Sequence, residues 1–67
     1  MRFSKEKMIE RLVKQGLAKE ITPDVIEIMD KMDGKEVQEY NWRNVVFDEN
    51  VGYISEFETY VNLDDCE

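Results

Sequence analysis

The sequence predicts an α+β fold in which an N-terminal αα-hairpin packs on a three- to four-stranded antiparallel β-meander. Apolar residues recur with helical spacing, between capping residues, over the first 34 positions. After Gly34 the period changes to two, and aromatic and β-branched residues become frequent. A chain of 67 residues has room for one small core, so residues 1–67 are expected to form a single domain, with helices in 1–34 and the meander in 35–67.

The first helix is expected over Lys5–Gln15. Ser4 precedes it as an N-cap whose hydroxyl accepts a hydrogen bond from an unpaired amide of the first turn. Gly16 follows as a left-handed residue, after which Leu17 folds back on the last turn. The expected apolar stripe consists of Met8, Ile9, Leu12 and Val13.

The second helix repeats this pattern after a short link at Gly16–Ile21. Thr22 is the expected N-cap, Pro23 occupies the first helical position, and Gly34 ends the helix. Its expected buried face consists of Val25, Ile28, Met29 and Met32.

Four segments of the second half alternate like strands, with a hairpin loop expected at Asp48–Asn50. The expected strands are Lys35–Tyr40, Trp42–Phe47, Val51–Ser55 and Phe57–Val61. The candidate core consists of Met8, Leu12, Val25, Met29, Val37, Val45, Ile54 and Val61. Trp42 fits either the centre of this core or an exposed interface.

The net charge of −7 is unevenly distributed. Residues 1–20 hold six basic and three acidic side chains, whereas residues 35–67 hold two basic and nine acidic ones. Lys7, Arg11 and Lys14 share the solvent side of the first helix, which raises the possibility of direct nucleic-acid binding. However, Glu6 and Glu10 interrupt this side of the helix, and the overall charge repels phosphate, so the sequence favours a solvated helix face.

The composition argues against an enzyme and against a resident metal or cofactor. The chain has no His, which removes His-based catalysis and His-ligated metals. Asp64, Asp65 and Glu67 lack the spacing of a calcium loop. Cys66 lies in an acidic segment that should raise its pKa, so a free, unreactive thiol is expected. No apolar run is long enough for a membrane span or a signal-peptide core.

The acidic second half combines carboxylates with aromatic side chains. Such a surface would attract a protein with a basic cleft, and Trp and Tyr often dominate interfaces. The alternative is an acidic surface that only keeps the protein soluble. The candidate partner-binding residues are Glu36, Glu39, Trp42, Asp48, Glu49, Glu56 and Glu58.

Three segments carry a resemblance that extends over nearly the whole chain: Gly34–Val37, Trp42–Val46 and the ending Tyr60–Glu67. Together with the opening Met1–Leu12, they resemble small uncharacterised phage and prophage proteins of Gram-positive bacteria. The start and end of the second half are also similar to strands of SH3-like small barrels.

The resemblance implies a phage accessory protein in the cytoplasm of a bacterial host. The leading hypothesis is a non-catalytic inhibitor that binds a host nucleic-acid-handling or defence enzyme through an acidic, nucleic-acid-mimicking surface. The alternative is a structural or assembly module that self-associates as a homodimer or binds another phage protein, because a dimer buries what a small monomer cannot.

Overall fold

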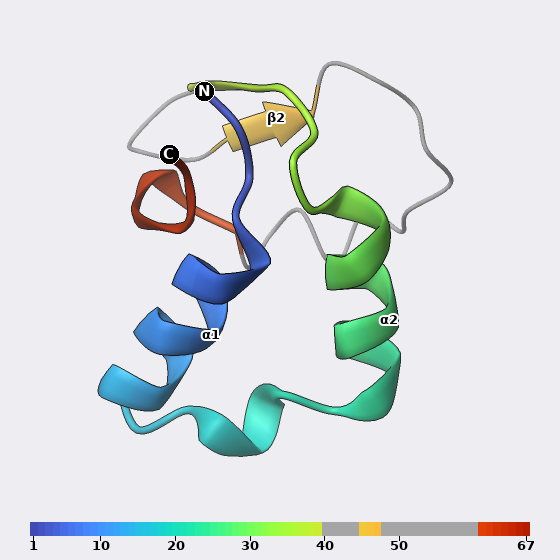
Figure 1. Ribbon diagram of the computed structural model, residues 1–67. Coiled ribbons are helices and arrows are strands. Elements are labelled where there is room, and N and C mark those ends of the chain that lie inside the picture. Colours follow the sequence, from blue (N-terminus) through green and yellow to red (C-terminus); the bar gives the residue numbers. More distant parts are fainter. Residues whose placement is uncertain (40–44, 48–60) are drawn as a thin grey trace.

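The computed structural model describes residues 1–39, 45–47 and 61–67, and its two main helices run in opposite directions (Figure 1). The described elements in chain order are α1 (Lys5–Lys14), the 3₁₀ turn η1 (Ala18–Glu20), α2 (Pro23–Met32), β1 (Val37–Glu39), β2 (Val45–Phe47) and the 3₁₀ turn η3 (Leu63–Asp65). The two helices expected from the sequence are therefore confirmed.

The ends of α1 follow the local sequence signals. The Ser4 hydroxyl accepts a hydrogen bond from the Lys7 amide at 3.3 Å. At the other end Gly16 has a φ of +74°. Its N–H donates to the Val13 carbonyl at 3.1 Å, and the Leu17 N–H donates to the Leu12 carbonyl at 2.7 Å. These two bonds form a Schellman motif, as the sequence predicted.

The ends of α2 differ from each other. Thr22 caps the start, where its hydroxyl accepts from the Val25 amide at 3.3 Å. The helix ends in a type II turn, because the Lys35 N–H donates to the Met32 carbonyl and Gly34 has a φ of +81°. The Gly34 N–H donates to the Phe3 carbonyl at 2.8 Å. This glycine therefore connects the helix end to the N-terminal segment, residues 1–4, which precedes α1.

The predicted β-meander is wrong for the part of the chain that the structure describes. There, β1 and β2 form a two-stranded antiparallel ribbon in which Val37 lies opposite Phe47. The strand expected at Val51–Ser55 lies outside the described residues. Only Val61 of the segment Phe57–Val61 is described, and it does not belong to a strand. In place of a closing strand, the last residues form η3 and pair with the N-terminal segment.

The N-terminal segment lies between two other segments of the chain. On one side Arg2 and Glu67 exchange backbone hydrogen bonds of 3.1 and 2.8 Å, and the Ser4 N–H donates to the Asp65 carbonyl at 2.8 Å. On the other side the Phe3 N–H donates to the Lys35 carbonyl at 3.0 Å. Segments that are distant in sequence thus satisfy each other's backbone groups, which binary patterning could not reveal.

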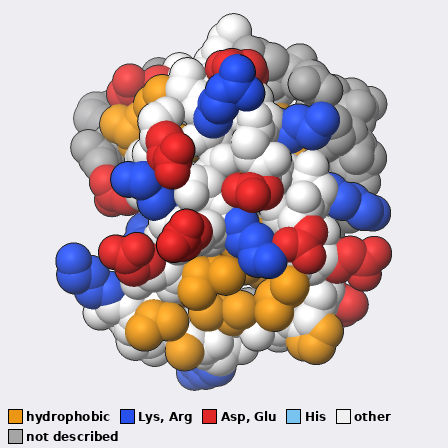
Figure 2. Space-filling model, in the orientation of Figure 1, with side chains coloured by type: hydrophobic (Ala, Val, Ile, Leu, Met, Phe, Trp, Pro, Cys, Tyr) orange, Lys and Arg blue, Asp and Glu red, His pale blue; other side chains and the backbone are white. Residues whose placement is uncertain are grey.

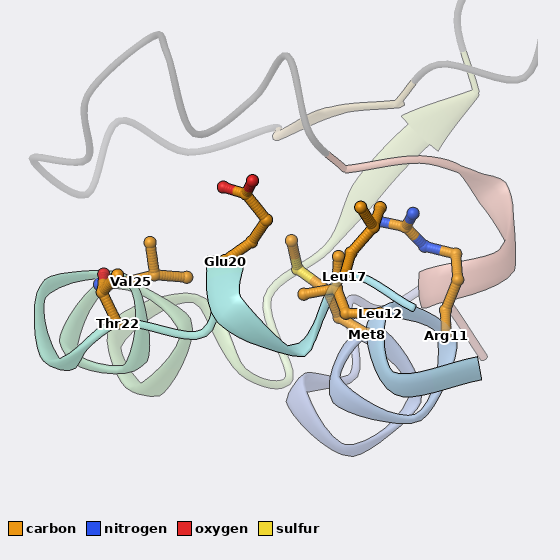
Figure 3. A pocket seen from close by; sticks show the side chains of 7 residues that line it. All are labelled: Met8, Arg11, Leu12, Leu17, Glu20, Thr22 and Val25. Atoms are coloured by element: carbon orange, nitrogen blue, oxygen red, sulfur yellow. The ribbon is translucent and has the colours of Figure 1, made fainter. Parts of the chain in front are cut away.

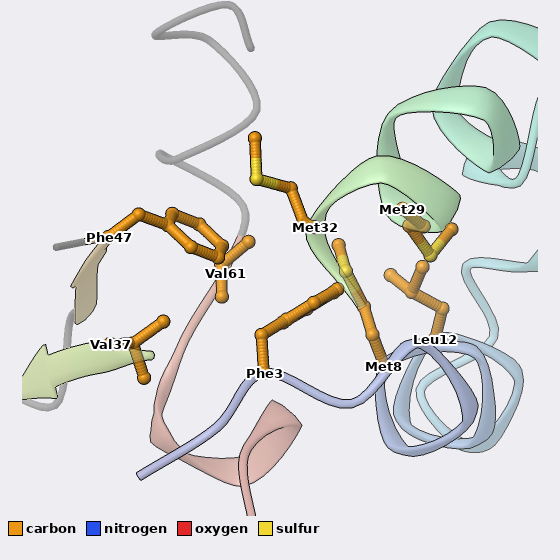
Figure 4. Packing of buried hydrophobic residues seen from close by; sticks show 8 residues of the cluster. All are labelled: Phe3, Met8, Leu12, Met29, Met32, Val37, Phe47 and Val61. Carbon is orange, nitrogen blue, oxygen red and sulfur yellow. The ribbon is translucent and has the colours of Figure 1, made fainter. Parts of the chain in front are cut away.

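The described core collects side chains from both helices, the ribbon and both ends of the chain (Figure 4). It consists of Phe3, Met8, Leu12, Met29, Met32, Val37, Phe47 and Val61. The rings of Phe3 and Phe47 meet edge to face, with centroids 5.7 Å apart.

Five of the eight core candidates are buried, and Val25 is half-buried. The predictions for Val45 and Ile54 fall on side chains outside the described part. Val13, which was expected in the buried stripe of α1, is 56% exposed. Because Met8 and Leu12 define the buried direction, a residue one position after Leu12 points about 100° away from it.

Candidate protein-binding surface

Two of the predicted partner-binding residues lie in the described part of the chain. The Glu36 carboxylate lies 3.2 Å from an Arg2 guanidinium nitrogen and 3.6 Å from the N-terminal ammonium, so two cations face it. Glu39 is exposed at the end of β1. Trp42, Asp48, Glu49, Glu56 and Glu58 lie outside the described residues, so the grouping of the predicted set stays a prediction.

Arg11 and Asp65 form a buried ion pair that joins α1 to η3. The Asp65 side chain is fully buried, and the Arg11 side chain is 13% exposed. Arg11 Nε donates to Asp65 Oδ1 at 2.6 Å, and Arg11 Nη2 donates to Asp65 Oδ2 at 3.0 Å. Bidentate geometry of this kind fixes both side chains and compensates part of the cost of removing two charges from water.

A local motif holds the Asp65 carboxylate in place. The Asn62 N–H donates to Asp65 Oδ2 at 3.0 Å, and the Asn62 side chain accepts from the Asp64 N–H at 2.8 Å. Asn62 and Asp65 thus form a capping box around η3. From the sequence alone, Asp65 was expected only as part of a terminal acidic cluster. The signal that could have revealed its role is the three-residue spacing of Asn62 and Asp65.

The ion pairs of the described residues also change the interpretation of the basic first helix. Lys5 Nζ pairs with the Asp30 carboxylate of α2, Arg2 pairs with Glu36, and Arg11 pairs with Asp65. The row of Lys7, Arg11 and Lys14 is therefore interrupted at its centre, because the Arg11 guanidinium faces η3. The solvated-face interpretation fits this arrangement better than a phosphate-binding row.

The outer side of α2 is acidic, which was not predicted from the sequence. Asp24, Glu27, Asp30 and Asp33 are all exposed. Among the described residues, Lys5 pairs with Asp30, and Lys31 Nζ lies 4.0 Å from Glu27 Oε1. Exposed pairs at this distance compensate little charge in water. Carboxylates on the helical half therefore add to the acidic surface expected on the second half.

Cys66 is a half-buried free thiol that follows Asp65, the buried member of the Arg11–Asp65 ion pair. Burial raises the pKa of the Cys66 thiol, and the Asp65 carboxylate adds to the rise, whereas the N-terminal ammonium lowers it. The predicted direction is confirmed, although burial rather than the acidic neighbours is the larger cause. A raised pKa keeps the thiolate scarce at neutral pH, which is unfavourable for nucleophilic chemistry.

A cavity of about 260 Å³ lies between α1, η1 and α2 (Figure 3). Its described lining is mainly apolar, and its two charged members are Arg11, which is bound to Asp65, and Glu20. The described residues that line it are Met8, Arg11, Leu12, Leu17, Glu20, Thr22 and Val25. This set offers shape and apolar contact rather than a nucleophile with an adjacent base. Within the described ranges, no group of three or more acidic or Cys side chains is arranged to hold a metal ion.

A scan against protein-family models found no match, and searches of curated proteins and of solved structures found none either. Among the described residues, neither helix is long and apolar enough to cross a membrane. The charges and surfaces of this chain are therefore the basis for inferring its function.

Proposed function

We propose that this chain is a non-catalytic protein that binds a basic surface of a nucleic-acid-handling or defence enzyme and inhibits it by mimicking nucleic acid. We place this activity in the cytoplasm of a bacterial cell, where the resemblance to phage and prophage proteins would locate it. The observation that carries the proposal is the pairing of cations within the fold.

Three cations from the first twenty residues are paired with carboxylates elsewhere in the chain. The positive charge that the sequence concentrates at its start is thus partly compensated internally. Glu39 and the outer carboxylates of α2 remain exposed. With a net charge of −7, such a surface attracts basic partners at long range and repels the phosphate backbone.

The test is capture of host proteins on the immobilised chain, followed by competition with duplex DNA. We expect retained proteins to be released by DNA and by salt, and their DNA binding to be blocked by the free chain in a gel-shift assay. Charge reversal at Glu39, Asp48, Glu49, Glu56 and Glu58 should weaken capture and flatten its salt dependence. Unchanged affinity and salt dependence in this variant would contradict the mimic proposal.

A direct gel shift of DNA by the chain alone at low salt would instead favour the basic face of α1 as a nucleic-acid site. A concentration-dependent mass in sedimentation, without any captured protein, would favour the self-association module.

A further inference from the structure

The Lys5–Asp30 ion pair defines one face of the helical hairpin. On α1, Ile9 and Val13 follow Lys5 at intervals of four residues, so all three lie along one side of the helix. On α2, Ile26 precedes Asp30 by four residues. The helices run in opposite directions (Figure 1), and the ion pair joins the first turn of α1 to the last turn of α2. Ile9 and Ile26 are therefore each one turn away from the pair along their own helix, on the same side as Lys5 and Asp30.

These apolar side chains are incompletely buried. Val13 is 56% exposed, and Ile9 and Ile26 are half-buried. Figure 2 shows a continuous hydrophobic patch over the lower part of the helical hairpin in this orientation. A contiguous apolar patch on a small acidic protein is a feature that usually has a binding role.

Carboxylates border this patch on both helices. On α1, Glu6 and Glu10 precede Ile9 and Val13 by three residues and lie beside them on the outer side. Both are exposed and have no partner among the described residues. On α2, Glu27 lies on the outer side next to Ile26 and is also exposed. Figure 2 shows acidic side chains on both the left and right margins of the patch.

We propose that this helix-pair face, consisting of Ile9, Val13 and Ile26 with the bordering Glu6, Glu10 and Glu27, docks a basic amphipathic helix of a partner protein. A helix with a row of aliphatic side chains fits along the seam between two antiparallel helices. Lysines or arginines on both sides of that row would meet carboxylates on both margins. A second copy of this chain fits less well, because it would bring acidic margins of the same sign together.

The inference depends on the proposed function only in assuming a basic partner, and it assigns binding to a different surface. The probe is a synthetic amphipathic helix of about 16 residues, with leucines along one side and lysines on both flanks. One matched peptide replaces the lysines by glutamates, and another replaces the leucines by alanines. Binding to the full chain is followed by amide chemical shifts and by calorimetry at low and at physiological salt.

We expect the lysine–leucine peptide to shift the amides of Ile9, Val13 and Ile26, with weaker binding as salt is raised. Both matched peptides should bind at least fivefold more weakly. Val13→Asp should lower the affinity for the peptide about tenfold, since it places a charge where the complex would bury an aliphatic side chain. Because Val13 is more than half exposed, this variant is expected to fold, which its amide spectrum would verify.

Two charge-reversal variants distinguish binding at the helix-pair face from binding at the acidic second half. Glu10→Lys borders the helix-pair face, whereas Glu39→Lys lies at the end of β1, and both change the net charge equally. Glu10→Lys should lower peptide affinity about threefold at low salt, with little effect from Glu39→Lys. Capture of host proteins that responds to Glu39→Lys alone would leave the proposed function standing and contradict this inference.

Three further results would overturn the inference. The first is equal binding of the lysine and glutamate peptides. The second is an unchanged affinity in Val13→Asp. The third is a concentration-dependent shift of Ile9, Val13 and Ile26 without peptide, which would assign this face to a second copy of the chain.

Discussion

The helical hairpin and the C-terminal segment 61–67 are held in place by different kinds of interaction. Each helix begins at a residue that caps its own first turn, and α1 ends in bonds between residues at most five positions apart. The C-terminal segment, in contrast, is attached through partners more than fifty positions away, namely Arg11, Arg2 and Ser4. Among the described residues, its local interactions centre on the capping box at Asn62.

This difference has an energetic consequence. A local cap contributes about 1 kcal/mol, and its loss lets one helix end fray. The attachment of the C-terminal segment includes a fully buried charge, whose partner cannot be removed without leaving an uncompensated ion. We therefore expect loss of the ion pair in the C-terminal segment to lower the free energy of unfolding more than loss of a helix cap, although the segment is short.

The largest effect is expected for Asp65→Asn. The amide still accepts from the Asn62 N–H but removes the carboxylate charge that pairs with the Arg11 guanidinium, which is only 13% exposed. The free energy of unfolding in urea should fall by about 3 kcal/mol or more. Glu67→Gln, at an exposed side chain of the same segment, is the matched control and should change stability by less than about 0.5 kcal/mol. Equal effects of the two variants would remove the distinction between the two regions.

An intermediate effect is expected for Gly34→Ala. An added Cβ meets no atom within 4 Å, so the cost comes from the φ of +81° alone. We expect a loss of about 1 to 2 kcal/mol in chemical denaturation. Gly34→Asn should cost less, because Asn tolerates this backbone region. A neutral Gly34→Ala variant would show that the turn can adopt another conformation.

A smaller effect is expected for Thr22→Ala at the start of α2. The variant removes the acceptor for the Val25 amide, and stability should fall by about 1 kcal/mol. Thr22→Ser retains the hydroxyl and should remain near the original stability. Hydrogen exchange should show faster exchange in the first turn of α2 with little change in η3. Faster exchange throughout the chain would indicate that the hairpin is not locally stabilised.

The smallest effect is expected from titration of Cys66. Because burial raises the pKa of this thiol in the folded state, its contribution to stability is present below the pKa of the unfolded thiol. It is lost as the pH rises through the higher pKa of the folded state. The difference in stability between the original chain and Cys66→Ala should therefore shrink above pH 9.0. A difference that grows with pH would contradict the assignment.

Much of the helical half was predictable, because its signals are local. Ser4, Gly16, Thr22 and Pro23 each determine backbone geometry through their immediate neighbours. The buried apolar stripe of α1 was predicted to include Val13, which is exposed. The spacing of apolar residues shows which side of the helix is apolar, but it does not show how much of that side other segments cover. That exposed residue became part of the candidate docking face.

The candidate site was predicted less well. Charge counting predicted an acidic surface on the second half, but it could not show which carboxylates face a cation. Glu36, a predicted binding residue, faces Arg2 and the N-terminal ammonium, whereas the exposed Asp24 and Glu27 of α2 had not been singled out. Ion pairing depends on which segments meet in space, and the positions of charged residues in the sequence do not show this.

By itself, the sequence determined the two helices, their caps, the left-handed glycines and the net negative charge. Only the tertiary structure decided that the last residues pair with the N-terminal segment in place of a closing strand, and that Asp65 is buried against Arg11. The physical reason is the distance along the chain over which each kind of interaction acts. Caps and helical periodicity act within a few residues along the chain, whereas backbone pairing between the two ends and a buried ion pair exist only when distant segments pack together.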